Sequence, residues 1–463
     1  MMNSQKYRTI LVVVISIVLF FFFAYFIERE NFYQLASQYI LLFIPFFYFL
    51  KFEKNNFSFL VGISILFRLV FLFAIPNLSQ DFYRFIWDGR MILEGFNPYI
   101  SLPETFIQER NFPINQATEL YQGMGELNGS HFTNYPPVNQ LNFLIAAILS
   151  NSSILGAAIV FRLQIILADI GIIYFGKKIL EKVNLPIHTI FLYALNPFII
   201  IEMTGNLHFE PVMLFFLVWS LYLLLKEKWI WAAIVLGISV SVKLIPLLFL
   251  PLFFQWFTST MFSNHPSTRL YNRKFSAIGF GKLCLFGLIV ILTNVALFLP
   301  FVSSELIGSY TNSVGLWFRN FEFNASLYYI AREIGYTFRG YNEIAVIGKI
   351  MPAIAIVFLA IITFFRKNKT PQQLISALLL GLTFYYFTTT TMHPWYLATL
   401  ILLSVFTKYR FTIIWSIAII LSYQAYANDP WKENLWFVAL EYTLVFGALF
   451  YEVFRKKKVM IIE

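Results

Sequence analysis

Residues 9–27 read Thr-Ile-Leu-Val-Val-Val-Ile-Ser-Ile-Val-Leu-Phe-Phe-Phe-Phe-Ala-Tyr-Phe-Ile, a stretch without a single charge. A secretory signal peptide has a shorter apolar core, of about 7–15 residues, followed by small residues at a cleavage site. This stretch is longer and lacks such a site, although Lys6 and Arg8 precede it as they would in a signal peptide. Because about 20 apolar residues cross a bilayer as a helix, we expect an uncleaved first span.

The whole chain has the composition of a membrane protein. Of its 463 residues, 59% are apolar and 13% are charged, and the mean hydropathy is +0.69. Soluble domains carry about 25% charged residues, so a soluble or disordered chain is excluded, and a lone cysteine excludes an intrachain disulfide. We expect an all-α polytopic membrane protein with about 13–14 transmembrane helices. The further apolar runs are 35–50, 57–75, 153–175, 186–203, 209–225, 229–243, 244–257, 283–301, 346–365, 372–389, 393–407, 411–427 and 434–454.

The basic residues orient these helices, because Lys and Arg accumulate in short loops that stay in the cytoplasm. Alternate loops hold 22 of the 34 basic residues. They are Lys6, Arg8, Lys51, Lys54, Lys177, Lys178, Lys182, Lys226, Lys228, Arg269, Arg273, Lys274, Lys282, Arg366, Lys367, Lys369, Lys408, Arg410, Arg455, Lys456, Lys457 and Lys458. Both termini are therefore expected in the cytoplasm of a multi-pass protein of the cytoplasmic (inner) membrane, with an even number of crossings that fits fourteen. The net charge of +10 then reports topology, and no nucleic-acid partner is expected.

We expect a single integral membrane domain over residues 1–463. Its sections are the first three spans (1–75), a long outer loop (76–152), the central spans (153–301), a second outer loop (302–345) and the C-terminal spans (346–463). Prolines in the first loop exclude one continuous helix, so amphipathic helices are expected in both loops. Residues 139–149 are too short to span comfortably, and we place them at or dipping into the outer interface.

The first outer loop contains a charged segment. It reads Gln80-Asp81-Phe82-Tyr83-Arg84-Phe85-Ile86-Trp87-Asp88-Gly89-Arg90 and holds two of the four aspartates of the chain. In a helix, Asp81 and Asp88 share a face, with Arg84 between them. A carboxylate at the membrane boundary can act as a general base toward a hydroxyl group. The alternative is a solvated, salt-bridged helix start.

Two aromatic turn segments lie in the same loop, at 95–99 (Gly-Phe-Asn-Pro-Tyr) and 134–137 (Asn-Tyr-Pro-Pro). Both can shape a pocket against Asp81, with Tyr135 in its wall. Aromatic faces suit the C–H face of a sugar ring, but Trp and Tyr at this depth also act as interfacial anchors. A single aromatic residue therefore decides little.

A polar turn interrupts the central spans after the Asn-Pro pair at 196–197. It contains Glu202, Asn206, His208 and Glu210. Polar groups at membrane depth are costly and tend to face a cavity or one another, so this turn is a candidate part of a site. The spacing His-x-Glu of His208 and Glu210 is unspecific for a metal, and no third ligand is evident.

Three further polar residues fall on the outer side. Lys243, Arg319 and His393 lie at turns or loops that the charge pattern places there. A cation at this surface can neutralise a phosphate, as Lys and Arg do in phosphate recognition. The alternatives are a lysine that reaches to lipid headgroups and a histidine that caps a tight turn.

Ionisable residues also fall inside expected spans. Arg68, Arg162 and Asp169 are of this kind, and Arg162 and Asp169 are seven residues apart on one helix face. We expect these two to form a structural ion pair and give none of the three a catalytic role.

Together these segments resemble the GT-C superfamily of membrane glycosyltransferases, and most of all its mannosyltransferases that take sugar from a polyprenyl phosphate. The motifs are Asp81-Phe82-Tyr83-Arg84-Phe85, Trp87-Asp88-Gly89-Arg90, Gly95-Phe96-Asn97-Pro98-Tyr99, Tyr135-Pro136-Pro137, Gly205-Asn206-Leu207-His208-Phe209-Glu210 and Lys243-Leu244-Ile245-Pro246. In that superfamily an acidic residue of the first long outer loop is the base, which maps onto Asp81. Many members have two adjacent acidic residues, whereas Gln80 precedes Asp81 here. This difference disfavours a divalent metal and leaves Asp88 as a second partner.

The resemblance implies a GT-C-type bundle that moves a hexose, expected to be mannose, from a polyprenyl-phosphate donor to a hydroxyl of a glycan, glycolipid or protein. In this inverting displacement Asp81 is the catalytic base, and membrane lipids are the surroundings. No cofactor or metal is expected. Substrate-binding roles are expected for Asp88, Arg84, Tyr135, Glu202, Asn206, His208, Glu210, Lys243, Arg319 and His393. The rival class is a multi-span transporter or flippase of lipid-linked sugars, for which many spans and intramembrane charges are equally expected.

Overall fold

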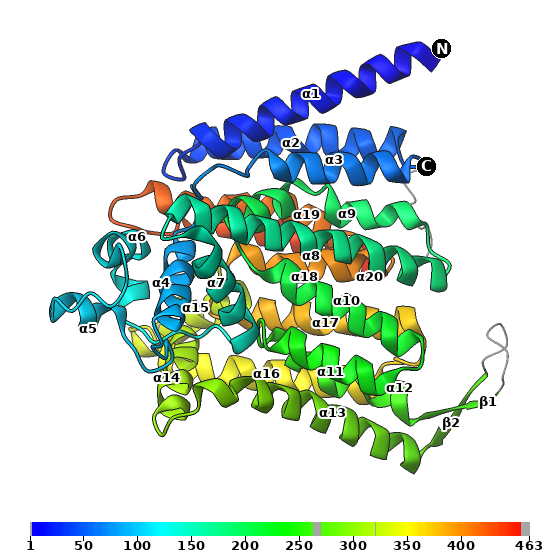
Figure 1. Ribbon diagram of the computed structural model, residues 1–463. Helices are drawn as coiled ribbons and strands as arrows, with labels where there is room; N and C mark the ends of the chain where they lie inside the picture. The colour runs from blue at the N-terminus through cyan, green and yellow to red at the C-terminus, as the bar shows by residue number, and fades with distance from the viewer. Residues whose placement is uncertain (1, 263–269, 320, 455–463) are drawn as a thin grey trace.

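The computed structural model describes residues 2–262, 270–319 and 321–454, with side chains over 5–259, 275–315 and 321–454. In this part of the chain, apolar helices lie side by side in a bundle (Figure 1). Six are long and apolar enough to cross a membrane, and a bent pair makes up to seven. They are α1 (Met2–Phe26), α2 (Phe32–Phe52), α8 (Ile154–Lys182), α13 (Ala277–Phe298), α16 (Ile344–Phe365) and α20 (Leu435–Phe454), and the bent pair is Ile187–Ala194 with Ile199–Gly205.

Every apolar range expected to span the membrane contains helix, which confirms the all-α polytopic class. The remaining ranges hold α3 (Phe57–Leu69), α10 (Glu210–Leu225), α11 (Trp229–Val240), η3 (Ile245–Phe253) with α12 (Phe254–Thr258), α17 (Pro371–Thr388), η6 (Pro394–Tyr396) with α18 (Leu397–Val405), and α19 (Phe411–Ala418) with η7 (Ile419–Ala427). The short helix η5 (Leu299–Phe301) follows α13, and the bent pair consists of η1 (Ile187–Ile190), α9 (Phe191–Ala194) and η2 (Ile199–Gly205). Because several of these helices are shorter than a bilayer is thick, the number of 13–14 crossings stays a prediction.

A short antiparallel hairpin was not expected. Its strands β1 (Ser259–Phe262) and β2 (Leu270–Phe275) pair with Met261 opposite Tyr271 and Phe262 opposite Leu270. The hairpin carries part of the basic loop that precedes α13. Arg269 and residues 455–458, which also entered the topology argument, lie outside the described residues.

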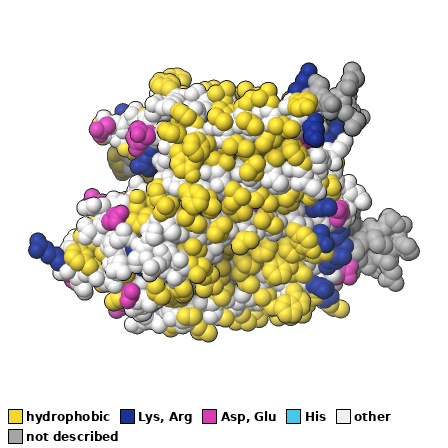
Figure 2. Space-filling model, turned by 45° about the horizontal axis from the view of Figure 1, so that its top comes forward, with side chains coloured by type: hydrophobic (Ala, Val, Ile, Leu, Met, Phe, Trp, Pro, Cys, Tyr) yellow, Lys and Arg dark blue, Asp and Glu magenta, His cyan; other side chains and the backbone are white. Residues whose placement is uncertain are grey.

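Both long loops fold into short helices, as expected, and these gather at one end of the bundle, here called the loop end (left in Figure 1). They are α4 (Asp81–Leu93), α5 (Pro103–Gln108), α6 (Ala117–Gly129), α7 (Pro137–Ser150), α14 (Leu306–Arg319) and α15 (Leu327–Arg339). The beginning of α1 and the end of α20 lie at the opposite, terminal end. Figure 2 shows Lys and Arg side chains concentrated at the terminal end, with a belt of apolar side chains between the two ends.

The apolar belt has the properties of a lipid-facing surface. Helices α1, α13, α16 and α20 expose large apolar side chains along their length, among them Val18, Leu292, Val357 and Leu444. Water would make such continuous exposure unfavourable, whereas lipid tails do not. The fold therefore needs a bilayer around it.

Helix α7 contains residues 139–149 and packs against α4 and α8. The approach of α4 to α7 requires a glycine, because a Cβ at Gly89 would lie 2.2 Å from the backbone oxygen of Phe143. Phe85 and Phe143 stack close by, with ring centroids 4.6 Å apart. These contacts fix the helix that begins with Asp81 against the bundle.

The predicted ion pair between Arg162 and Asp169 is wrong. Arg68 on α3 holds Asp169 instead, with its Nε 2.7 Å from Oδ2, and the hydroxyl of Tyr193 donates to Oδ1 over 2.9 Å. Arg162 donates to backbone oxygens of Thr204, Gly205 and Leu72. The physical reason is that η2 ends there and leaves carbonyl groups without helical partners, which a guanidinium can satisfy.

The bent pair explains why the polar turn exists. Its two parts meet at an angle of 58°, because a proline at position 197 cannot continue the preceding helix. Asn196 accepts from the backbone N–H of Phe198 over 3.0 Å and donates to the Oγ of Ser416 over 3.0 Å. At the far end of the turn, Asn206 accepts from the backbone N–H of Leu78, three residues before Asp81.

Candidate active site

A cavity of about 680 Å³ lies at the loop end, where both long loops meet the C-terminal helices. This is the size of a typical small-molecule site, which ranges from about 300 to 1,000 Å³. Its charged and amide or imidazole side chains are Arg29, Gln80, Asp81, Arg84, Asn128, His131, Asn134, Lys243 and His393. Its aromatic side chains are Phe132, Tyr135, Phe321, Tyr385, Tyr386, Trp395, Tyr396, Tyr426 and Trp431. An aliphatic wall is made of Leu244, Ile245, Leu247, Leu248 and Val314.

Asp81 is the first residue of α4, and its side chain is half-buried in the cavity wall. Asn128, near the end of α6, donates from Nδ2 to the Oδ1 of Asp81 over 3.4 Å. Burial raises the pKa of the Asp81 carboxyl above its ordinary value, and the ammonium group of Lys243 is the main opposing influence. A carboxylate with a raised pKa is a stronger proton acceptor, which suits a general base.

Arg84 is anchored by Asp88, one helical turn further along α4. The Nε of Arg84 lies 2.7 Å from Oδ1 of Asp88, whose Oδ2 accepts from Gln140 over 3.1 Å. The Nη1 of Arg84 donates to the backbone oxygens of Asn128 and His131. Asp88, which was expected to bind substrate, is fully buried and does not line the cavity. It orients Arg84, which does line the cavity.

Lys243 and Glu210 form an ion pair at the cavity wall. Lys243 follows α11, and its Nζ donates to the Oε1 of Glu210, the first residue of α10. The Lys243 side chain is 16% exposed and the Glu210 side chain 2% exposed, so only the lysine reaches the cavity. An ammonium group has three N–H donors, and Lys243 therefore keeps donors for a ligand.

The polar turn lies behind the wall. Glu202 accepts from the hydroxyl of Tyr423 over 2.6 Å and from Asn206 over 3.3 Å, and its Oε2 is 4.0 Å from Nε2 of His208. These side chains are buried, and neither they nor Glu210 are among the lining residues. Glu202, Asn206, His208 and Glu210 therefore lie behind the cavity wall, and their expected roles in substrate binding stay predictions. The Nε2 of His208 and the Oε2 of Glu210 have no hydrogen-bond partner in the described part of the chain.

Stacked rings connect the polar turn to the cavity. The ring of His208 lies 3.9 Å from that of Trp395, which in turn lies 4.4 Å from the ring of His393. Trp395 and His393 line the cavity. His393 and Lys243 thus line the same cavity.

Tyr135 lines the cavity as expected, and the two aromatic turn segments meet there. The hydroxyl of Tyr99 donates to the backbone oxygen of Tyr135 over 2.8 Å, and the Tyr135 ring packs edge-on against Phe85. Burial raises the pKa of the Tyr135 hydroxyl well above its ordinary value. Tyr135 therefore stays protonated and can donate a hydrogen bond to a ligand.

Over residues 11–259 the chain matches the family model described as Alpha-(1->6)-mannopyranosyltransferase, N-terminal domain. This match covers more than half of the chain. The chain belongs to this family. This match confirms the resemblance to GT-C mannosyltransferases that the sequence motifs indicated. Most of the expected site residues, from Asp81 to Lys243, lie inside the matched range.

One curated relative shows how far the likeness extends. The chain is 24% identical over 203 residues to Alpha-(1->6)-mannopyranosyltransferase A of Corynebacterium glutamicum, which corresponds to 43% of this chain and 38% of that protein. The chain thus covers about two fifths of the length of that mannopyranosyltransferase. No solved structure matches the chain.

Among the expected residues, Arg319 is the last residue of α14, and its side chain lies outside those described. Sequence reasoning missed several lining residues, notably Arg29, Asn128, Tyr426 and Trp431. Arg29 stands just after the first span and Trp431 just before the last one. Nothing in the local sequence of either residue indicates that segments so far apart in the chain line the same cavity as Asp81.

No group of three or more His, Cys, Asp or Glu side chains is arranged to hold a metal ion among the described residues. The carboxylates near Asp81 are engaged in ion pairs. The two other carboxylates in the vicinity, Asp88 and Glu210, are paired with Arg84 and Lys243. Asp81 thus lacks a second free carboxylate of the kind that Mg²⁺ or Mn²⁺ sites use. Independence from metal ions stays a prediction.

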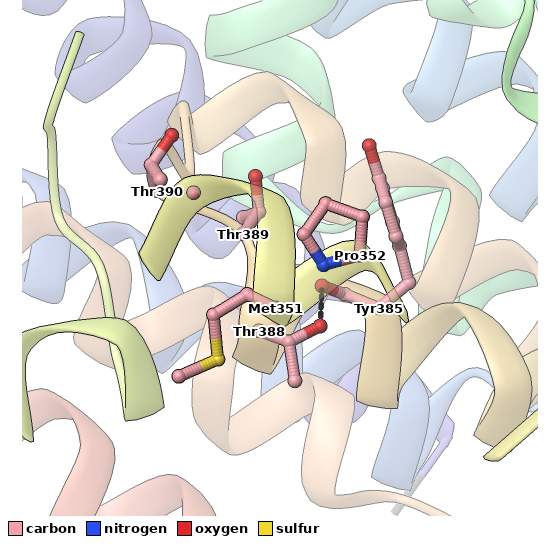
Figure 3. A pocket seen from close by; sticks show the side chains of 7 residues that line it. Met351, Pro352, Tyr385, Thr388, Thr389 and Thr390 are labelled. Atoms are coloured by element: carbon pink, nitrogen blue, oxygen red, sulfur yellow. Dashed lines mark hydrogen bonds between the residues drawn. The ribbon is translucent and has the colours of Figure 1, made fainter. Parts of the chain in front are cut away.

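A second hollow, between α16 and α17, has no comparable chemistry (Figure 3). Its volume is about 10 Å³, room for about one water molecule. Met351, Pro352 and Thr388 surround it, and the hydroxyl of Thr388 donates to the backbone oxygen of Tyr385 over 2.9 Å. This hydroxyl is already bonded within its own helix, so the hollow is a packing defect and not a site.

Proposed function

We propose that the protein is a membrane mannosyltransferase that moves a mannosyl residue from a polyprenyl-phosphate donor to a hydroxyl of a glycan, glycolipid or protein. One observation carries this proposal. A half-buried carboxylate, Asp81, and a cation, Lys243, line one cavity that is also lined by several aliphatic side chains. Membership of the α-(1→6)-mannopyranosyltransferase family supports the choice of mannose.

The cavity suits a donor with a charged head and an apolar tail. Leu244, Ile245, Leu247 and Leu248 follow Lys243 directly in the chain and line the cavity together with Val314 of α14. A phosphate beside Lys243 would therefore have aliphatic side chains next to it for an isoprenoid chain. The Nη2 of Arg84, a buried nitrogen without a hydrogen-bond partner in the described part of the chain, supplies a further donor near the same cavity.

The reaction is a single displacement. The acceptor oxygen bonds to the anomeric carbon of mannose as its proton passes to the carboxylate of Asp81. The bond from the anomeric carbon to the phosphate oxygen breaks, and its electron pair leaves with the polyprenyl phosphate. Lys243 stabilises the negative charge that develops on that phosphate, and the configuration at the anomeric carbon inverts.

We place this reaction on the outer face of the cytoplasmic membrane, with both chain termini in the cytoplasm. The arrangement of the charges supports this placement. Basic side chains concentrate at the terminal end (Figure 2). The cavity is lined by Asp81 of α4 and by other residues of the loop end. In the positive-inside pattern the basic end faces the cytoplasm.

The test uses the full-length protein in liposomes, with radiolabelled polyprenyl-phosphate mannose and α-(1→6)-mannotriose. A new mannosidic bond in the opposite anomeric configuration to that of the donor is expected. Transfer should occur in liposomes whose loop end faces the substrates and not in those of the other orientation. Movement of the labelled lipid across the bilayer without any new glycosidic bond would contradict the proposal and favour a flippase.

A further inference from the structure

The side chain of Gln80, the residue before Asp81, is held at both ends of its amide. Its Oε1 accepts from the Nη2 of Arg29 over 3.4 Å, and its Nε2 donates to the backbone oxygen of Met124 over 2.9 Å. A guanidinium only donates and a carbonyl oxygen only accepts, so both bonds together need a side-chain amide. A carboxylate at this position would turn an oxygen toward the Met124 oxygen. Gln80 therefore links Arg29 to α6 directly before the proposed base.

The backbone of α6 allows this contact. Gly125 interrupts the helix with a φ of +75°, in the left-handed region that favours glycine. A Cβ there would lie 2.9 Å from the Nε2 of Gln80. Met124, whose oxygen accepts the bond, is fully buried. The amide of Gln80 is thus fixed to a rigid part of the structure.

Arg29 lies in the connection between α1 and α2 and lines the same cavity as Asp81. Its guanidinium is 5.0 Å from the centre of the Tyr426 ring, a cation–π contact, and its Nε is 3.1 Å from Oε1 of Glu30. The Glu30 side chain is 64% exposed, and an exposed ion pair contributes little. Gln80 and Tyr426 are therefore the contacts that fix the guanidinium at the cavity.

The charge of Arg29 acts on Asp81. Burial raises the pKa of the Asp81 carboxyl, and the charges of Lys243 and, to a smaller extent, Arg29 oppose this rise. Lys243 is paired with the buried Glu210, which itself raises the pKa of Asp81. The carboxylate paired with Arg29 is the exposed Glu30 instead. Arg29 thus supplies a cation whose effect on Asp81 is independent of the pair between Lys243 and Glu210.

Other ionisable groups surround Asp81. Three tyrosines of the cavity interact with it electrostatically, and their hydroxyl groups carry no charge at neutral pH: Tyr135, Tyr396 and Tyr426. The remaining ionisable side chains that line the cavity are Arg84, which pairs with Asp88, and His131, Tyr385, Tyr386 and His393. The acidic side chains of α6, Glu119 and Glu126, are exposed.

We propose that Gln80 is a positioning residue that holds the Arg29 guanidinium within electrostatic range of Asp81, and that Arg29 keeps this base ionised when the donor phosphate occupies Lys243. This role rests on the proposed function, in which the phosphate binds Lys243. A bound phosphate brings negative charge into the cavity and offsets the charge of Lys243, and both changes favour a protonated Asp81. A protonated Asp81 cannot accept a proton from the acceptor hydroxyl. Arg29, held separately by Gln80 and Tyr426, is the cation that then favours the carboxylate.

The experiment measures kcat of the full-length protein in liposomes against pH, with polyprenyl-phosphate mannose and α-(1→6)-mannotriose. The pH dependence of kcat reports the substrate-bound enzyme and so tests the base with the donor in place. At the acidic pH where wild type keeps half of its maximal kcat, Arg29→Gln and Gln80→Met should each lower kcat about two- to fivefold, the effect of one partly screened charge. On the alkaline side, where Asp81 is ionised in every variant, kcat should stay within about twofold of wild type. Arg29→Lys retains the charge and should restore the wild-type profile.

A double variant shows whether Gln80 acts through Arg29. Arg29→Gln combined with Gln80→Met should change the profile no more than Arg29→Gln alone, because both substitutions remove the same charge effect. The control is Arg339→Gln, which removes a cation of α15 whose side chain is 65% exposed and does not line the cavity. Its profile should match that of wild type. Thermal inactivation of each variant, measured across the same pH range, separates loss of the base from unfolding.

A second measurement needs no transfer. A hydrophobic carbodiimide reacts with protonated carboxyl groups, so the labelling of Asp81, quantified by mass spectrometry in the presence of polyprenyl phosphate, follows its ionisation. Labelling should extend to higher pH in Arg29→Gln and Gln80→Met than in wild type and Arg339→Gln. A wild-type protein that transfers no mannose would contradict the proposed function, whereas the labelling still tests the effect of Arg29 on Asp81.

Three results would overturn the role given to Gln80 and Arg29. They are kcat and labelling profiles of Arg29→Gln that coincide with those of wild type, an equal shift in Arg339→Gln, and additive effects in the double variant. A higher KM for the donor in Arg29→Gln, with an unchanged pH profile, would likewise show that Arg29 binds the donor and does not act on the base.

Discussion

Asn128 donates a hydrogen bond from its Nδ2 to the Oδ1 of Asp81 over 3.4 Å. The same residue accepts, through its backbone oxygen, a hydrogen bond from Arg84, which Asp88 holds in place. The buried pair on α4 thus fixes the end of α6, and α6 in turn orients the carboxylate of Asp81. Asp88 therefore helps to orient Asp81 through Arg84 and Asn128, a role that its position in the sequence did not indicate.

The pH dependence of transfer follows from this arrangement. Asp81 acts as a base only when ionised, and as the pH falls through its pKa it takes up a proton and loses that ability. Because burial raises this pKa, kcat/KM should begin to fall at a higher pH than the ordinary aspartate value implies. Asn128→Leu removes a hydrogen bond that lowers the pKa of Asp81. In this variant, the fall of kcat/KM on the acid side of the pH profile (the acid limb) should therefore begin at a still higher pH.

This prediction is checked by pH profiles of kcat/KM for wild type, Asn128→Leu and the control Asn111→Leu, which changes an exposed residue of the same loop. An acid limb that stays in place in Asn128→Leu, or that moves equally in the control, would show that Asn128 does not orient the base.

Lys243 is expected to have two roles that a double variant separates. Lys243→Met leaves Glu210 buried without its partner, which costs about 3–5 kcal/mol in comparable buried pairs, so the variant should be unstable and inactive. Lys243→Met combined with Glu210→Gln removes the unpaired charge and should recover thermal stability in detergent. Transfer should remain lost, because the donor phosphate still lacks its cation. Full activity of the double variant would rule out phosphate stabilisation by Lys243.

Gly89→Ala should disrupt the contact between α4 and α7. The added Cβ would meet the backbone of Phe143, which cannot move without displacing α7, and overpacking of this kind costs about 1–3 kcal/mol. Gly287→Ala is a matched control, because a Cβ there meets no atom within 4 Å. Thermal inactivation in detergent should be faster for Gly89→Ala and unchanged for Gly287→Ala. Equal behaviour of the two variants would be evidence against close packing of α4 on α7.

Chelation should leave the reaction intact. Asp81 has no second free carboxylate beside it, because Asp88 and Glu210 are engaged by Arg84 and Lys243. Purified protein treated with EDTA and returned to metal-free buffer is therefore expected to keep its full transfer rate. A loss of activity that Mg²⁺ or Mn²⁺ restores would mean that a cation bridges Asp81 and the donor phosphate.

Much of the fold could be predicted because membrane helices are governed by local sequence. Long apolar stretches such as residues 9–27 and 434–454 form helices without reference to the rest of the chain, and the Lys and Arg pattern sorted the loops onto opposite ends. The hairpin β1–β2 was missed, since it interrupts a basic loop that carries no helical signal. The pairing of Arg68 with Asp169 depends on contact between α3 and α8, which spacing along α8 does not encode.

The site was predictable in part for a related reason. Asp81, Tyr135, Lys243 and His393 were recognised as polar or aromatic residues on the outer side, and the cavity does bring them together. Whether a polar residue lines a cavity or lies behind it depends on side-chain packing, and so the sequence did not indicate that Glu202 and His208 lie behind the cavity wall. Arg29 and Trp431 stand near the first and last spans, and only the closed bundle brings them to the cavity that Asp81 lines.

The central claim is that the carboxylate of Asp81 accepts the proton of the acceptor hydroxyl. Its most direct test is the single-turnover rate of mannosyl transfer by Asp81→Asn, compared with wild type and with Asp429→Asn, which changes an exposed aspartate that does not line the cavity. We predict that Asp81→Asn slows transfer by about 10²- to 10⁴-fold, the usual contribution of a general base, with donor binding retained. Asp429→Asn should match wild type. A rate for Asp81→Asn within a few-fold of wild type would contradict the account.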